Sequence, residues 1–113
     1  MQLSPNTIEK ILQFRDGRNW KQFHNPKDMA ISINLEASEL LEIFQWSGED
    51  TQCTGKYGKI REELADVLIY CILMADICNL DIDKIINEKL VCNEKKYPVE
   101  KAYGNNLKYN DLK

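Results

Sequence analysis

The stretch from Arg61 to Ile77, REELADVLIYCILMADI, decides the fold. On a helix that turns about 100° per residue, nearly every direction after Asp66 carries an apolar side chain. Leu73 and Ile77 fall about 20° to either side of Asp66, and Tyr70 falls about 40° away. A helix that is apolar on all sides is normally buried on all sides. We therefore expect a central helix in a homodimer or homotetramer, because one short chain can hardly cover it.

Start and stop signals for three further helices surround this stretch. Ser4-Pro5 and Asn25-Pro26 each place a capping side chain before a proline at the first helical position. Asp81 or Asp83 caps a last helix that Pro98 ends, because the residue before a proline resists helical geometry. No stretch alternates apolar and polar residues as a strand would. The chain is predicted to be all-α, an antiparallel four-helix bundle-like subunit that assembles through its helices.

The boundaries of this predicted domain follow from the same signals. Residues 1–98 form a single all-α domain, and residues 99–113 form a polar C-terminal tail that is expected to be partly disordered after Gly104. The second helix should extend from Pro26 to about Trp46, and the third from about Lys56 to about Asn79.

Composition excludes several classes of protein. The 113 residues are enough for one domain, and 43% hydrophobic with 29% charged residues is typical of a globular protein. A net charge of −3 gives no support for binding a nucleic-acid polymer. No apolar run approaches the about 18 residues of a membrane span, and the first residues lack a secretory pattern, so we expect a cytoplasmic protein. Four cysteines without C-x-x-C spacing are expected to be reduced core thiols.

Two acidic pairs with three-residue spacing are the strongest functional signal. They are Glu36-x-x-Glu39 and Glu63-x-x-Asp66, each within a helical apolar pattern. Side chains at i and i+3 are neighbours on a helix, so each pair presents two carboxylates to one point. Carboxylates beside an apolar surface are costly unless a cation neutralises them. Oxygen ligands select Mg²⁺, with Mn²⁺ as a substitute.

Two other interpretations of the acids were weighed. They could be half-exposed and paired with basic neighbours such as Lys59 or Arg61, but two such motifs on consecutive helices favour a metal site. A di-iron carboxylate bundle would need a Glu-x-x-His motif on two helices. The one histidine, His24, lies in neither acidic motif, so this interpretation is rejected.

The sequence also resembles a known family. WKQFHNPKDMAISINLEASELLEIFQW, then EELADVLIYCILMADICNLDI, then NEKKYP are similar to the MazG-like all-α nucleoside triphosphate pyrophosphohydrolases, and most to their short dCTP pyrophosphatase-like branch. The resemblance covers about Trp20 to Pro98. It implies hydrolysis of a nucleoside triphosphate, above all a deoxynucleoside triphosphate such as dCTP, to the monophosphate and pyrophosphate, as house-cleaning of the nucleotide pool. It departs from MazG proper at Leu35, where an acid is common, so a fifth acid would have to come from Glu42.

The resemblance implies roles for individual residues. The metal ligands would be Glu36, Glu39, Glu63 and Asp66. Substrate contacts would come from His24, Tyr70, Lys89, Asn93 and Lys96, with Trp20 and Trp46 bordering the base pocket. A core or surface role remains open for each of these substrate residues.

A mechanism follows from the acids and the resemblance together. A carboxylate not fully committed to metal, either Glu39 or Glu36, would orient or deprotonate the water that attacks the α-phosphorus. Lysines of the last helix would help to neutralise the pyrophosphate. The alternatives are a dUTPase-like all-α pyrophosphatase with another base pocket, and a non-catalytic helical regulator on the same scaffold.

Overall fold

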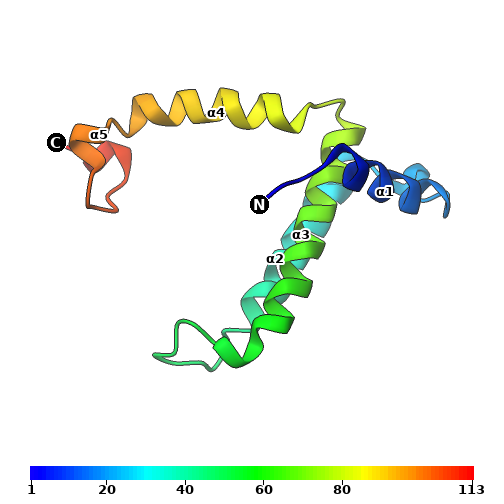
Figure 1. Ribbon diagram of the computed structural model, residues 1–113, viewed down its shortest axis with the longest axis horizontal. Coiled ribbons are helices and arrows are strands. Elements are labelled where there is room, and N and C mark those ends of the chain that lie inside the picture. The colour runs from blue at the N-terminus through cyan, green and yellow to red at the C-terminus, as the bar shows by residue number, and fades with distance from the viewer. The chain divides into compact units, whose positions relative to one another are not determined.

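The computed structural model describes residues 1–113 and is helical throughout (Figure 1). It consists of two compact units, Met1–Asn79 and Leu80–Lys113, which are described separately. The first unit contains α1 (Pro5–Asp16), the 3₁₀ turn η1 (Lys21–Phe23), α2 (Pro26–Glu42), the 3₁₀ turn η2 (Thr54–Lys56) and α3 (Tyr57–Ile77). The second contains α4 (Ile82–Lys96), α5 (Val99–Ala102) and η3 (Tyr109–Asp111). The predicted all-α class is confirmed.

The helices begin where the sequence predicts. The Ser4 hydroxyl accepts a hydrogen bond from the Thr7 backbone N–H at 3.1 Å, ahead of α1. The Asn25 side chain accepts one from the Asp28 N–H at 2.9 Å, ahead of α2. The Asp81 carboxylate does the same at 3.1 Å ahead of α4. Each cap satisfies a backbone donor that has no partner within its helix.

The second helix ends earlier than predicted, at Glu42 instead of Trp46. Trp46 and Gly48 have φ angles of 69° and 59°, left-handed values that an α-helix does not contain. The Lys56 ammonium donates a hydrogen bond to the Ile43 carbonyl at 3.3 Å, which ties the end of α2 to the start of α3. The sequence pattern missed this end because the apolar periodicity continues through Phe44.

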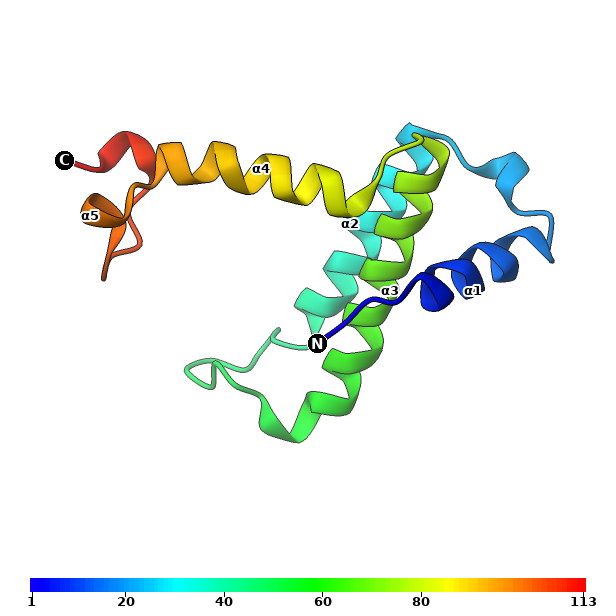
Figure 2. The same ribbon diagram turned by 45° about the horizontal axis from the view of Figure 1, so that its top comes forward.

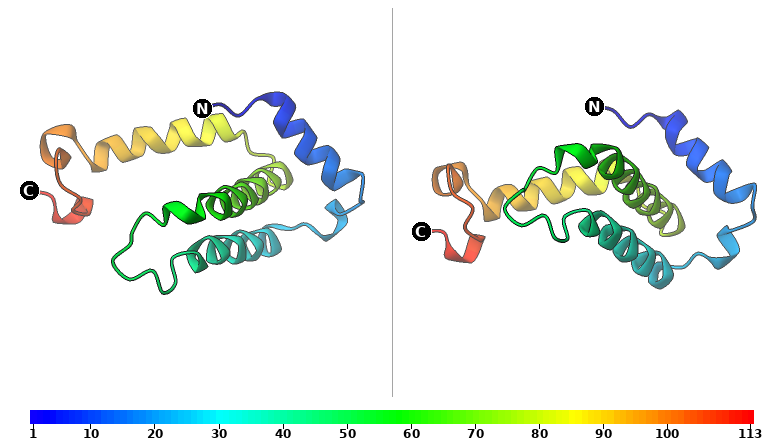
Figure 3. Two further views of the ribbon diagram at one scale, coloured as in Figure 1. Left: turned by 60° about the horizontal axis from the view of Figure 1, so that its bottom comes forward. Right: turned by 90° about the horizontal axis from the view of Figure 1, so that it is seen from below.

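The first unit is built on the antiparallel pair α2 and α3, which lie side by side in every view (Figures 1 to 3). Its core consists of Met29 and Ile43 from the α2 side and Ile72, Leu73 and Ala75 from α3. These side chains are almost fully removed from water, which is the main favourable term in folding. Helix α1 contacts α3 (Figure 2).

Helix α3 is not buried on all sides within this chain. Leu64 and Leu68 are 45% and 53% exposed, and Ile31 and Leu35 on α2 are 47% and 59% exposed. The expectation that the cysteines form part of the core holds for Cys53, whereas Cys71 and Cys92 are exposed. The first unit by itself therefore leaves apolar surface uncovered on both central helices.

Residues 99–113 of the second unit, which the sequence predicts to be a polar tail, contain short helical elements. After α4, the short helix α5 and the turn η3 bring Tyr109 back to the end of α4. The rings of Tyr97 and Tyr109 meet edge to face with centroids 6.2 Å apart, and the Lys96 ammonium lies 5.0 Å from the Tyr109 centroid. Because α4 belongs to this unit, the four-helix bundle and the single domain 1–98 stay predictions. No helix combines the length and apolarity that a membrane crossing requires.

The capping interaction of α2 is testable by substitution. Asn25→Ala is expected to lower the free energy of unfolding by about 1 kcal/mol, because the Asp28 N–H loses its acceptor. Asn25→Ser retains an acceptor, so its free energy of unfolding should fall by only a few tenths of that loss. Denaturant unfolding followed by circular dichroism measures both. Equal losses would contradict a role for the cap oxygen.

Candidate metal and nucleotide site

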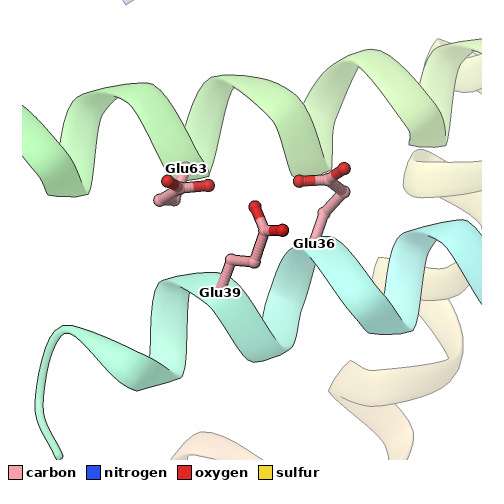
Figure 4. Close-up of side chains that lie close together, drawn as sticks. All are labelled: Glu36, Glu39 and Glu63. Carbon is pink, nitrogen blue, oxygen red and sulfur yellow. The ribbon is translucent and has the colours of Figure 1, made fainter.

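Three of the predicted acids lie together between α2 and α3. Glu36 and Glu39 extend from α2 and Glu63 from α3, and all three side chains point into the space between the helices (Figure 4). One carboxylate oxygen from each lies within 4.8 Å of the others. The i, i+3 spacing puts both α2 acids on the face that meets α3. We call Glu36, Glu39 and Glu63 the carboxylate cluster.

Two oxygens of this cluster lack hydrogen-bond partners. The Oε2 atoms of Glu36 and Glu63 are buried and accept no hydrogen bond. The Lys59 ammonium lies 3.8 Å from Glu63 Oε1, but its side chain is 64% exposed and it offers one charge to three acids. Buried carboxylate oxygens without partners carry a large desolvation cost. The cluster is therefore short of positive charge.

The pKa of Glu63 also indicates that the carboxylate cluster is short of positive charge. A proton shared with Glu39 raises the pKa of Glu63 above its ordinary value, and burial and repulsion from the Glu39 charge raise it further. Attraction to Lys59 opposes this rise, and the nearby charge of Asp66 adds to it. A raised pKa of this kind is expected of neighbouring carboxylates that lack a counter-charge. An all-oxygen donor set with two unsatisfied oxygens fits Mg²⁺ or Mn²⁺, whereas structural zinc favours sulfur and nitrogen.

The fourth predicted ligand, Asp66, lies outside the carboxylate cluster. It is on α3, three residues after Glu63, and lines a pocket of about 400 Å³ between α1 and α3. We call this the α1–α3 pocket. Asp66 is close enough to influence the pKa of Glu63. The cluster and the pocket are therefore neighbours along one helix, with Asp66 between them.

The α1–α3 pocket contains three of the predicted substrate residues. Tyr70 contributes from α3, and Trp20 and His24 contribute from the segment between α1 and α2. The Trp20 ring meets the Phe14 ring edge to face, with centroids 5.8 Å apart. Burial lowers the pKa of His24, and the charge of Arg15 lowers it further, so the imidazole is neutral near pH 7. Its Nδ1 atom is buried without a partner.

Four predicted substrate residues belong to other parts of the chain. Trp46 lies in the turn after α2 with 92% of its surface exposed, outside the residues that line the pocket. Lys89, Asn93 and Lys96 lie on α4, in the second unit.

One residue of the pocket wall was missed from the sequence. Arg15 is 2% exposed and lines the pocket from α1. The signal was present: on a helix Arg15 follows Ile8 and Ile11 at spacings that place all three on one face, and a charge on an apolar face needs a partner. The partner, Asp76, is 61 residues away in sequence, so the pattern could not identify it.

Comparisons with known proteins agree with the all-helical fold. Residues 31–112 match the MazG-like family. The dCTP pyrophosphatase 1 of Rattus norvegicus is 34% identical over 94% of this chain and 68% of its own length, and that of Homo sapiens is 32% identical over the same shares. A solved pyrophosphatase structure from Archaeoglobus fulgidus superposes with a TM-score of 0.77 at 39% identity, over 82% of this chain and 90% of its own.

The chain is an all-helical subunit with acidic side chains on two adjoining helices, and the comparisons identify its family. The chain belongs to the MazG-like family. The predicted enzyme class, a hydrolase of the nucleotide pyrophosphatase type, is supported by the curated relatives and by the solved structure.

Metal and protons should compete for the carboxylate cluster. Because the folded-state pKa of Glu63 is raised, its protonated form favours folding at low pH, and this contribution is lost as pH rises through that pKa. Mg²⁺ should therefore raise Tm more at pH 8 than at pH 5. At pH 8 and saturating metal, we expect Tm to rise by at least about 4 °C. Thermal melting measures the shift.

Glu63→Gln is the matched variant for this measurement. It removes both the proton-binding group and a metal ligand, so the Mg²⁺-dependent shift should shrink at pH 8 and lose most of its pH dependence. An equal shift at both pH values in the unaltered protein would contradict competition between metal and protons, and no shift at either pH would contradict metal binding at the cluster.

Proposed function

We propose that this protein is a Mg²⁺-dependent nucleoside triphosphate pyrophosphohydrolase that acts on deoxynucleoside triphosphates such as dCTP. One observation carries the proposal: a carboxylate cluster with two buried, unpartnered oxygens adjoins a pocket of about 400 Å³ along α3. The volume lies within the usual range for small-molecule sites. Relatives named dCTP pyrophosphatase 1 support this class of substrate.

The metal would be held by the carboxylate cluster. Glu36 and Glu63 each offer an oxygen that has no other partner, and Glu39 completes the group. Asp66, beside the cluster on α3, would be the fourth ligand and would face the triphosphate. Bound Mg²⁺, or Mn²⁺ in its place, supplies Lewis-acid polarisation of phosphoryl and water oxygens.

The sequence left Glu39 and Glu36 open as the catalytic base, and Glu39 is the better candidate. It is the exposed member of the cluster, so its carboxylate can reach a water molecule from solvent. Glu36 has a buried oxygen that is better suited to holding metal. Glu39 would take a proton from water as the water oxygen bonds to the α-phosphorus. The bond from the α-phosphorus to the oxygen bridging it to the β-phosphorus breaks, and pyrophosphate leaves.

The nucleoside would occupy the α1–α3 pocket. The Trp20 ring offers a stacking surface, and the Tyr70 hydroxyl needs a polar partner of the kind a sugar or phosphate supplies. Neutral His24 can donate one hydrogen bond and accept another, which suits a nucleobase edge. Lys89, Asn93 and Lys96 of α4 would contact phosphates or sugar, and Trp46 would border the base. We keep these four assignments, and a cytoplasmic location, as predictions from the sequence.

Turnover is the direct test of the proposal. The pure protein is incubated with Mg²⁺ and each of the common ribo- and deoxyribonucleoside triphosphates, and monophosphate and pyrophosphate are quantified. We expect equimolar products, with deoxynucleotides preferred. Preference for dUTP would favour the dUTPase-like alternative. No turnover of any nucleotide would favour the non-catalytic regulator.

Substitution identifies the residues. Glu36→Gln, Glu39→Gln and Asp66→Asn are each expected to reduce kcat by at least about 100-fold, the usual scale for loss of an acid–base or charge-stabilising group. Glu62→Gln is the matched control, because Glu62 is an exposed acid on the same helix that lies outside the cluster. Circular dichroism confirms that each variant folds. Unchanged activity in Glu36→Gln and Asp66→Asn would eliminate this site.

We also propose that the enzyme is a homodimer or homotetramer assembled through α2 and α3. Leu64 and Leu68 on α3, with Ile31 and Leu35 on α2, leave apolar surface exposed in a single copy. The two residues on each helix are four apart and so lie on one face of it, and exposed apolar surface of this kind often marks an interface.

The assembly can be tested by light scattering coupled to gel filtration. The unaltered protein should elute as a dimer or larger species, and Leu68→Lys should shift it toward the mass of one chain, because a charge would be buried without a partner. Leu107→Lys, an exposed leucine in the second unit, is the control. A monomer for the unaltered protein would contradict the proposal.

A further inference from the structure

Arg15 is the one charged residue that the structure buries. Its side chain is 3% exposed, in the last turn of α1, and it forms part of the wall of the α1–α3 pocket. A buried guanidinium is tolerated only when it is well paired. The proposed chemistry does not use Arg15, so its retention in the pocket wall needs another explanation.

The side chain of Arg15 links α1 to α3. Its Nη1 donates a hydrogen bond to Asp76 Oδ2 at 2.6 Å, and its Nε donates one to Asp16 Oδ1 at 2.9 Å. Asp76 lies in the last turn of α3. Burial lowers the pKa of Arg15, but the hydrogen bonds and charges of Asp16 and Asp76 outweigh it and raise the pKa, so the group stays charged.

The backbone of Arg15 holds the opposite wall of the pocket. Its carbonyl accepts hydrogen bonds from the N–H groups of Arg18 at 3.2 Å and of Trp20 at 3.1 Å. Trp20 in turn begins the 3₁₀ turn η1, where its carbonyl accepts from the Phe23 N–H at 2.9 Å, and His24 follows. The carbonyl of Arg15 therefore anchors the start of the segment that carries Trp20 and His24.

We propose that Arg15, held by Asp76, is a positioning residue that sets the spacing between Trp20 and His24 on one side of the α1–α3 pocket and α3 on the other. Its side chain fixes α1 to α3, and its carbonyl fixes the Trp20 turn to α1. The inference rests on the proposed function, because it assumes that the nucleoside binds in this pocket. The guanidinium is engaged by Asp16 and Asp76, and the proposal gives it no part in the chemical step. Loss of the link should weaken nucleoside binding more than it slows the chemical step.

Asp76→Asn and Asp16→Asn form a matched pair for the test. Each removes one carboxylate charge from the same guanidinium, but only Asp76 connects two helices, since Asp16 is next to Arg15 in the chain. Steady-state kinetics with the preferred nucleotide should give a KM at least about tenfold higher for Asp76→Asn with kcat changed less than about threefold, because uniform binding is lost. Asp16→Asn should change KM by less than about threefold.

The position of the Trp20 turn can be followed by fluorescence. In a Trp46→Phe background Trp20 is the one tryptophan that remains, because the chain contains two. Asp76→Asn should then increase the quenching of Trp20 by acrylamide, and Asp16→Asn should not. Arg15→Lys, which can still pair with Asp76 but lacks the two-pronged guanidinium, should give intermediate values of KM and of quenching.

Stability alone is the competing explanation, and the measurements separate it from positioning. A purely structural role lowers Tm but leaves KM and Trp20 quenching unchanged for the folded protein at the assay temperature. If Asp76→Asn does not fold, Arg15→Met with Asp76→Leu replaces the pair by apolar groups, a change that often preserves stability. Unaltered KM in a folded variant of either kind overturns the proposal.

Failure of the proposed function gives a different result. If the unaltered protein hydrolyses no nucleoside triphosphate, the function itself is wrong. If the unaltered protein is active and Asp76→Asn has the same KM, only the role of Arg15 is wrong.

Discussion

Three carboxylates approach one another between α2 and α3, the two helices on which the first unit is built, with oxygens within 4.8 Å. Acids so close cannot all be ionised without a counter-charge, and the raised pKa of Glu63 is the consequence in the absence of metal. Burial of Met29 and Ile43 on the α2 side and of Ile72 and Leu73 on α3 supplies the stability that holds them there. Hydrophobic burial thus maintains a repulsive arrangement that a divalent cation would relieve, as expected for a functional site.

A second constraint acts on the other face of α3. Helix α1 is amphipathic and short, and it is joined to α3 by the buried pair of Arg15 and Asp76. The resulting pocket contains a neutral histidine with a free nitrogen and two aromatic rings in contact. Asp66 lies in this pocket, three residues after Glu63 in the cluster. One helix therefore carries an acid of the carboxylate cluster and the acid that lines the pocket, which is the spatial relation that the proposed nucleoside triphosphate substrate would require.

The apolar surface that one chain leaves uncovered has a physical reason in the length of the protein. A domain of about 100 residues buries a smaller share of its surface than a larger one. Here α3 meets α2 on one side and α1 on another, and Leu64 and Leu68 stay exposed. The second unit is held together differently. Contacts of Tyr109 with Tyr97 and Lys96 keep the last residues near the end of α4, although their composition is polar.

The sequence by itself determined the helical class, the starts of α1 and α2 after Ser4 and Asn25, and the pairing of acids on α2 and α3. These depend on local hydrogen bonds and on helical periodicity, which are properties of neighbouring residues. For α4 it left Asp81 and Asp83 as alternative caps, and the structure shows Asp81. The sequence failed at the end of α2, where the apolar pattern continues to Phe44 although the α-helix ends at Glu42 and gives way to turns. Only the tertiary structure decided that Glu36, Glu39 and Glu63 converge while Asp66 faces the pocket, and that Arg15 finds its partner 61 residues away in Asp76. Contacts between helices depend on how the helices cross and which side chains reach one another, and no local pattern contains that information.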